Sequence, residues 1–173
     1  GTLSWTSNAA ATDIDGLSDS KSAGTDFTGS LLLGHQTTGT LDEAVNNLGV
    51  GLAALDAITS GDYNTAIGFG ALTAHTAGGQ NTAVGANTML ADAGSYNTVL
   101  GVVAGQNISS TGHYNTLLGR GAGNNVTSGD ANVIIGSVDA DSATGNHQLK
   151  ITGYDGTTTV NWISGDSSGI LSI

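Results

Sequence analysis

The side chains in this sequence that could perform acid–base chemistry are few and scattered. Polysaccharide cleavage, for example, usually depends on two or three carboxylates held close together. The nearest approach to such a set is Asp139 and Asp141, with Asp130 earlier in the chain. Spacings of this kind arise by chance in acidic loops. We therefore predict no catalytic residue and no enzyme activity.

Metal ligands are equally sparse. Asp13 and Asp15 alternate in the same way as Asp139 and Asp141, but neither pair has the spacing of a calcium-binding EF-hand loop. The sequence has no cysteine, which excludes a thiol nucleophile and a cysteine-based zinc site. We predict no metal site and no cofactor, although a structural ion on the acidic surface stays open. The histidines are expected to be solvated loop residues; they are His35, His75, His113 and His147.

Three tyrosines have a more regular arrangement, because Tyr63, Tyr96 and Tyr114 each stand directly before an asparagine. Stacked at one position of a repeat, they would form a partly continued aromatic ladder. Such a ladder packs neighbouring repeats or an adjoining chain, and we favour that role. Aromatic faces also suit the apolar C–H faces of sugar rings. We therefore name these tyrosines, together with His113, as candidate receptor-binding residues.

The tyrosines belong to a repeat that extends from Gly61 to Gly136. Each copy has an opening glycine, an asparagine three residues later, an apolar pair and a closing glycine, and the asparagines are 17, 16, 18 and 17 residues apart. A fixed period of this size predicts a stack of short coils, a parallel β-solenoid in an all-β fold. The residues expected to hold the coils are Asn64, Asn81, Asn97, Asn115, Asn132 and the closing glycines Gly68, Gly85, Gly101, Gly119 and Gly136.

One half of each copy is constant in length and the other half is not. The opening and closing glycines are always seven residues apart, whereas the stretches between copies contain 9, 8, 10 and 9 residues. We expect the constant half to be the packed strand and the variable half to be loop. The asparagine is expected to adopt the left-handed conformation of a tight corner, and the closing glycine to form the next corner.

Imperfect copies extend the pattern to both sides. Leu31–Gly34 and Asn46–Gly49 place a glycine after a leucine, and Gly153 follows the last full copy, which predicts about eight coils. Between the copies, Leu41–Val45 and Leu52–Leu55 are each expected to form one helical turn.

The chain divides into three predicted parts. Residues 1–28 form an irregular N-terminal cap, which includes a short strand at Leu3–Thr6 and an apolar plug of Trp5 and Phe27; residues 29–145 form the repeat domain. Residues 146–173 form a C-terminal β-hairpin cap, with strands at Gln148–Thr152 and Thr158–Ile163 joined by an Asp-Gly turn, and a last short strand at Ile170–Ile173.

The apolar pair in each copy predicts assembly. Neighbours on a strand point to opposite faces, so Ala66 and Ile67, or Leu117 and Leu118, require both faces to be dry. One residue of the pair fills the coil, and a thin coil has nothing with which to cover the other. We therefore expect the solenoid to pack side by side with copies of itself, as a homotrimer about an axis parallel to the stack. The rival interpretation is a monomer with a fully buried strand.

The overall charge excludes several partners. The formal net charge is −11, with three lysine and arginine residues against 14 acidic ones. Nucleic acids require cationic neutralisation of their phosphates, so we predict no nucleic-acid partner. No apolar run reaches the roughly 18 residues of a transmembrane helix, and we predict no membrane insertion.

The repeat resembles known proteins. Gly61–Gly68, followed by Phe69-Gly70-Ala71-Leu72, is similar to the head repeat of YadA-like trimeric adhesins and, more closely, to the longer repeats of bacteriophage tail-fibre proteins. Leu149–Gly153 and Trp162–Asp166 resemble the segment that follows such repeats in phage fibres. The resemblance implies a left-handed parallel β-roll, three chains side by side, and a location on a virion or outside a cell.

From this resemblance we expect a structural and receptor-binding segment of a trimeric phage tail fibre. Its partner would be a glycan or a protein of the host cell surface. The head domain of a bacterial trimeric autotransporter adhesin is the alternative, and a polysaccharide-cleaving tailspike is a third interpretation.

Overall fold

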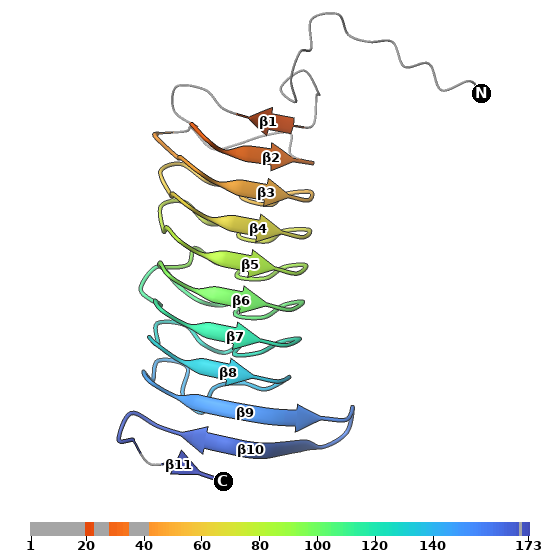
Figure 1. The fold of residues 1–173 in the computed structure, drawn as a ribbon, viewed down its shortest axis with the longest axis vertical. Coiled ribbons are helices and arrows are strands. Elements are labelled where there is room, and N and C mark those ends of the chain that lie inside the picture. Colours follow the sequence, from red (N-terminus) through yellow and green to blue (C-terminus); the bar gives the residue numbers. More distant parts are fainter. Residues whose placement is uncertain (1–19, 23–27, 35–41, 170) are drawn as a thin grey trace, which may run out of the picture.

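The computed structural model describes residues 20–22, 28–34, 42–169 and 171–173, and in this part of the chain every regular element is a strand (Figure 1). The strands form one continuous sheet in which the spatial order follows the order in the chain. They are β1 (Ser20–Ser22), β2 (Leu31–Leu33), β3 (Leu48–Val50), β4 (Thr65–Ile67), β5 (Thr82–Val84), β6 (Thr98–Leu100), β7 (Thr116–Leu118), β8 (Val133–Ile135), β9 (Leu149–Tyr154), β10 (Thr159–Gly165) and β11 (Leu171–Ser172).

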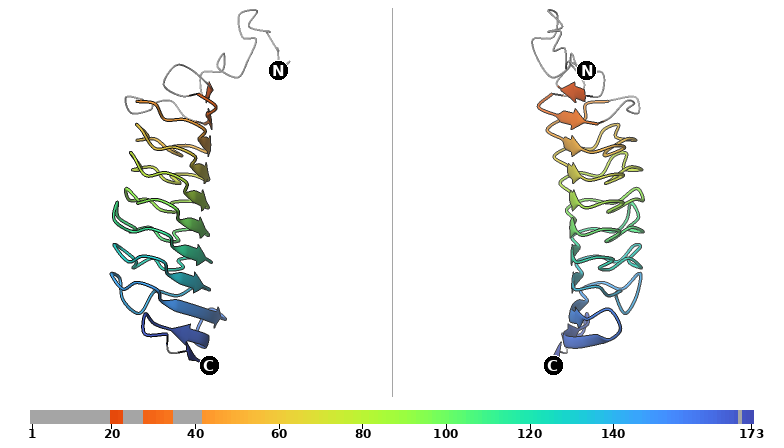
Figure 2. Two further views of the ribbon diagram at one scale, coloured as in Figure 1. Left: turned by 60° about the vertical axis from the view of Figure 1, so that its left-hand side comes forward. Right: turned by 90° about the vertical axis from the view of Figure 1, so that its right-hand side faces the viewer.

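Strands β2 to β9 pair in parallel, each with the next, which makes a parallel β-solenoid of about seven turns. The predicted all-β solenoid is thus confirmed, with about seven turns in place of the expected eight. The strands line up along one side of the stack and the connecting loops stack on the other (Figure 2). With about 4.8 Å between strands, the parallel part is roughly 35 Å long.

In each of the strands β2 to β8 the middle residue faces inward and its two neighbours face outward. Ala66, Val99 and Leu117 are completely buried, whereas Ile67 is 39% exposed and Leu100 is 50% exposed. This confirms that one residue of each apolar pair fills the coil interior. The outer residue of the pair remains on the surface of the single chain.

The coil interior is filled by a strand residue and a turn residue of complementary size. In the coil of β4 the strand residue is small and the turn residue is large, as with the fully buried Ala66 and Leu72. In the coils of β6 and β7 the relation is reversed. A Cβ atom added to Gly105 would lie 2.9 Å from Cδ1 of Leu117, and one added to Gly123 would lie 2.8 Å from Cδ2 of the same leucine. Leu117 therefore occupies the volume that these glycines leave, which keeps the narrow interior close-packed.

The corner before each strand is formed by the residue that precedes the asparagine. Tyr63, Tyr96 and Tyr114 have φ angles of 58°, 63° and 59°, in the left-handed region, while the asparagines do not have positive φ. The prediction that asparagine makes this corner is therefore wrong by one residue. The closing glycines do form the next corner as predicted; Gly68, for instance, has φ 133°, and a Cβ there would lie 2.6 Å from the carbonyl oxygen of Gly85.

The imperfect copies at the two ends have a different register from the one predicted. Val50 pairs with Ile67, so Gly51, and not Gly49, is the closing glycine of that coil. Gly49 lies in the middle of β3 and faces inward, where its missing side chain leaves room for Leu32 and Leu55. At the other end Ile151 pairs with Ile135, which aligns Thr152, and not Gly153, with Gly136.

The recurring asparagines of the repeat form a buried hydrogen-bonded ladder. The Oδ1 atom of each accepts the backbone N–H of the next asparagine, at 2.9–3.1 Å for the steps from Asn47 to Asn132. The Nδ2 atom of each donates to the carbonyl oxygen of the next opening glycine, at 2.8–3.0 Å. Ser30 begins the ladder and Gln148 ends it. The carbonyl oxygens of the opening glycines therefore accept hydrogen bonds from the ladder, and these bonds hold the segment before each strand close to it.

The last strands leave the coil pattern. β9 is parallel to β8, but β10 pairs antiparallel with β9, and β11 antiparallel with β10. In the connection between β9 and β10, Asp155 accepts the N–H groups of Thr158 and Thr157 at 2.8 and 2.9 Å, and these bonds lower the pKa of its carboxyl group. Strands predicted for residues 148–152 and 158–163 are thus present.

The expected single helical turns are absent from the described residues. Residues 52–57 form turns in which Ala53 and Leu55 have left-handed φ angles of 59° and 57°, which a right-handed helix does not allow. Some predictions lie outside the described residues, namely those for Leu3–Thr6, Trp5, Phe27, His35 and Leu41.

We predict that Asn97→Ala lowers the free energy of unfolding by about 3 kcal/mol, because the buried N–H of Asn115 and the carbonyl of Gly112 both lose their partner. Chemical denaturation followed by circular dichroism measures this change. The matched control is Asn107→Ala, which removes an exposed hydrogen bond to Asn124 and should cost less than about 1 kcal/mol. Equal costs for the two variants would show that the ladder does not stabilise the fold.

Candidate functional site

The three candidate tyrosines lie along one edge of the sheet, where the strands begin. Tyr63, Tyr96 and Tyr114 are 57%, 49% and 59% exposed, because the left-handed corner turns each ring away from the coil. The rings of Tyr96 and Tyr114 stack, with centroids 4.8 Å apart and planes 4° from parallel. Tyr63 is separated from this pair by Gln80, so the structure forms the aromatic ladder for two of the three residues.

His113 lies next to the stacked pair, but its ring is hydrogen-bonded to the backbone of the preceding coil. Its ring centroid is 6.3 Å from that of Tyr114, and its Nδ1 atom accepts the N–H of Ser95 at 2.9 Å. Its own N–H donates to Oδ1 of Asp130 at 2.7 Å. One ring nitrogen of His113 therefore holds two coils together and is not available to a ligand.

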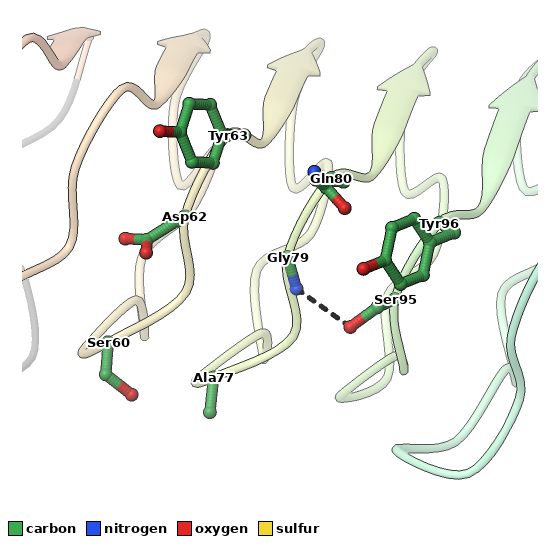
Figure 3. Close-up of a pocket in the computed structure, with 8 residues that line it drawn as sticks. All are labelled: Ser60, Asp62, Tyr63, Ala77, Gly79, Gln80, Ser95 and Tyr96. Carbon is green, nitrogen blue, oxygen red and sulfur yellow. Dashed lines mark hydrogen bonds between the residues drawn. The ribbon is translucent and has the colours of Figure 1, made fainter.

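We call each coil, seen as one level of the stack, a rung. A hollow of about 220 Å³ lies between the rungs that carry Tyr63 and Tyr96 (Figure 3). Asp62, Gly79 and Gln80 line it together with these tyrosines, and sequence reasoning missed all three of them. A signal was present in the sequence. The residues before the asparagine are Asp62-Tyr63, Ser95-Tyr96 and His113-Tyr114 in three copies, but Gly79-Gln80 in the copy between.

The outward face of the sheet carries a second feature, which we call the aliphatic column. It consists of the last residue of each parallel strand from β3 to β8, where the face is half-buried or exposed. These residues are Val50, Ile67, Val84, Leu100, Leu118 and Ile135. Beside it, at the first strand position, stands a column of threonines, Thr65, Thr82, Thr98 and Thr116.

The apolar surface continues around the corner made by the closing glycines. Directly after the closing glycines of three coils lie Leu52, Phe69 and Val102, which are 60%, 55% and 48% exposed; the same position holds Ala86, Arg120 and Ser137 in the other coils. We call Leu52, Phe69 and Val102 the corner column. The aliphatic column and the corner column thus form two apolar strips that meet at one edge of the solenoid, opposite the edge that carries the tyrosines.

The carboxylates singled out in the sequence are not brought together. Asp139 accepts the N–H of Asn125 at 3.1 Å, Asp130 accepts that of His113, and Asp141 forms an ion pair with Lys150. Among the described residues no three histidine or acidic side chains are placed to hold a metal ion. Each of these aspartates bonds within the fold. The described residues also contain no helix of the length and apolarity needed to cross a membrane.

His75 is not the solvated loop residue that was predicted. Its side chain is completely buried, in the coil that precedes the one with the shortest loop, and its Nε2 atom donates to the carbonyl of Gly78. Its Nδ1 atom has no hydrogen-bond partner and lies 3.7 Å from Oδ1 of Asp92. Burial lowers the pKa of His75 below its ordinary value of 6.5, more than the Gly78 carbonyl and Asp92 raise it.

Asp92 explains why a histidine fits at this place. In neighbouring coils the backbone N–H of Thr59 and Ser109 donates to a backbone carbonyl of the next coil, at 3.0 and 2.8 Å. In the coil that is one residue shorter, the carboxylate of Asp92 accepts the N–H and hydroxyl of Thr76 instead, both at 3.0 Å. The carboxylate of Asp92 thus replaces the backbone carbonyl that accepts this hydrogen bond in the other coils. The ring of His75 lies beside this carboxylate.

No family model, curated protein or solved structure matches this chain.

We predict that His75→Ile reduces the loss of stability between pH 7 and pH 5 by about 1–2 kcal/mol. The unfolded chain binds a proton on this histidine below pH 6.5, but the folded state resists it, so the wild-type protein loses stability as the pH falls through that value. Chemical denaturation at both pH values, at one protein concentration, measures the difference. The control is the exposed His147, replaced by Asn, which should lose as much stability as wild type. An equal loss in His75→Ile would contradict the assignment.

Proposed function

We propose that this chain is a β-roll segment of a homotrimeric attachment fibre, of the kind found in bacteriophage tail fibres, and that it acts in binding to a host surface. The observation that carries the proposal is the exposed aliphatic column, which includes Leu100 at 50% exposure. In this proposal the roll is left-handed, the three chains lie side by side, and the antiparallel strands after β9 close the end of the stack.

The extent of the apolar surface favours a partner of the same length. The aliphatic column extends over β3 to β8, and the corner column runs beside it. Soluble single chains rarely expose contiguous apolar patches larger than a few hundred Å², and larger patches mark interfaces. Another copy of the same solenoid, in the same register, supplies an aliphatic-column side chain in every coil from β3 to β8 and a corner-column side chain in three of these coils.

The angle between the two columns favours three chains over two. A twofold dimer would use one self-complementary face, whereas a ring uses two different faces of each chain. Ile67 and Phe69 lie on the two sides of the corner at Gly68, and Val50 with Leu52 and Leu100 with Val102 repeat this arrangement, so three coils offer two apolar faces that meet at an edge. In our proposal the aliphatic column of one chain packs against the corner column of the next, with the axis along this edge.

The tyrosine edge is then the surface proposed for attachment to a cell-surface glycan or protein. Tyr63 stands four residues before Ile67, on the order of 13 Å away along the strand, and is directed to the rim of the assembly. We propose no catalytic activity and no cofactor for this segment. The same surface would serve the head of a bacterial trimeric adhesin, which stays the alternative, and a cleaving tailspike gains no support from the separated carboxylates.

We predict a mass of about 51 kDa in light scattering coupled to size-exclusion chromatography, three times the 17.0 kDa of one chain. The trimer is expected because burial of the aliphatic and corner columns stabilises the associated state. A species of 17.0 kDa at micromolar concentration would refute the proposed assembly.

A pair of variants separates the interface from the loops. Leu118→Asp places a charge in the aliphatic column and should abolish the trimer, while the strand spectrum in circular dichroism is retained because this side chain points out of the coil. Insertion of one glycine after the exposed Ser110 lies in the half of the repeat that varies in length and should leave the trimer intact. If both variants assemble equally well, the assignment of faces is wrong.

A further inference from the structure

A second ladder runs beside the tyrosines, two residues before each asparagine. At this position the backbone N–H of one coil donates to the side chain of the corresponding residue in the next coil. Val45 donates to Asp62 at 2.8 Å, Gly79 to Ser95 at 3.1 Å, Ser95 to His113 at 2.9 Å and His113 to Asp130 at 2.7 Å. Each of these N–H groups is satisfied by a side chain that the next copy supplies.

The ladder is interrupted at one rung. The residue that should receive the N–H of Asp62 is Gly79, which has no side chain. A Cβ added to Gly79 would lie 3.0 Å from the carbonyl oxygen and 3.7 Å from the backbone nitrogen of Asp62, so Gly79 lies against the backbone of Asp62 and offers its N–H no side-chain acceptor. No acceptor for this N–H lies among the described residues. The result is one backbone donor that faces the hollow.

The column of tyrosines is interrupted at the same rung. Gln80 has a φ of 60°, nearly that of Tyr63 and Tyr96, and so occupies the place of a tyrosine. Figure 3 shows the rings of Tyr63 and Tyr96 on the two sides of Gln80. Coils two rungs apart are separated by about 9.6 Å. Contacts of about 3.5–4.0 Å on each face of an inserted ring leave room for a single puckered ring, which would lie beside the side chain of Gln80.

The polar groups of the hollow are neutral and close together. They are the hydroxyl of Ser60, the N–H of Asp62, the side-chain amide of Gln80 and the hydroxyl of Ser95, which already accepts from Gly79 and can donate its own hydrogen. The carboxylate of Asp62 is turned to the preceding coil, where it holds Val45. No lysine or arginine lines the hollow, so an anionic ligand would find no counter-charge.

We propose that this hollow, between Tyr63 and Tyr96, binds one neutral pyranose ring of a glycan. The apolar C–H faces of the sugar pack on the tyrosines, and its hydroxyl groups bond to Asp62 N–H, Gln80 and Ser95. This inference deepens the proposed attachment function and rests on it. It specifies one rung of the tyrosine edge as the site, and a neutral sugar as its ligand.

The repeat itself supplies the variants for a test. The double variant Gly79→Ser with Gln80→Tyr turns this rung into a copy of Ser95-Tyr96, which gives Asp62 N–H an acceptor and fills the space between the tyrosines. The matched control is Ala131→Tyr, which extends the tyrosine column by one coil beyond Tyr114 and away from the hollow; Ala131 has the φ of 55° that this position requires. Tyr63→Ala removes one wall of the hollow without adding bulk.

The probes are the methyl glycosides of glucose, galactose, mannose and N-acetylglucosamine, with that of sialic acid as the anionic comparison. Binding to the full chain is measured by saturation-transfer NMR and by amide chemical shifts. We expect at least one neutral glycoside to bind and to shift the Asp62 amide, with sialic acid weaker. The double variant and Tyr63→Ala should lower the affinity at least tenfold, and Ala131→Tyr should leave it within twofold.

Absence of binding by every neutral glycoside would overturn the inference, and so would an unchanged affinity in the double variant whose unfolding temperature matches wild type. The mass of each sample is recorded in the same buffer. A trimer that binds no sugar overturns the sugar site alone, whereas a monomer that binds sugar at this rung overturns the proposed assembly alone.

Discussion

The structure depends on a buried column of amide side chains. Each asparagine from Asn47 to Asn132 accepts a backbone N–H from the following coil and donates to a carbonyl of that coil, with neither group exposed to water. A buried amide that loses its partners costs far more than it contributes when paired. Every turn of the solenoid must therefore place an asparagine at the same position of the ladder, whatever the number of residues in its loop.

This requirement allows the loops to vary while the strands keep their register. The coils contain between 16 and 18 residues, yet Thr65, Thr82, Thr98 and Thr116 pair directly with one another. Where the loop 86–93 is one residue short, the carboxylate of Asp92 takes the place of a main-chain acceptor, next to His75 of the preceding coil. Because register is fixed, each position of the repeat becomes a continuous column on the surface. Assembly and recognition can then occupy different columns of the same rungs.

The period, the apolar pairs and the glycines were enough to predict the parallel solenoid, the burial of one residue of each apolar pair and the corner at the closing glycines. They also placed Tyr96 and Tyr114 in one column. The role of the asparagines could not be read from a propensity for left-handed backbone, because the residue before them takes that conformation and the asparagine side chain turns inward. Gly49 was misassigned because a glycine can serve the interior, where Leu32 takes its space, as well as a corner.

Two features of the site depend on residues of the neighbouring coil and can be recognised only when the coils are aligned with one another. His75 occupies the position that the completely buried Ile58 has one coil earlier, so its burial follows from aligning the coils, and Asp92 of the shorter next coil lies beside its ring. The free N–H of Asp62 is a property of the rung after it, since the residue that fails to accept it is Gly79. An unpaired donor of this kind arises where one copy of the repeat lacks a side chain that the other copies have. A motif taken from one copy alone does not reveal this difference.

The most direct test of the central claim, that the aliphatic column is an interface, is hydroxyl-radical footprinting of the native protein. Leu100 and Leu171 form a matched pair of leucines, 50% and 56% exposed in the single chain. We predict that Leu100 is oxidised several-fold more slowly than Leu171, because another copy of the chain covers it. Equal oxidation of the two leucines would contradict an interface on this face.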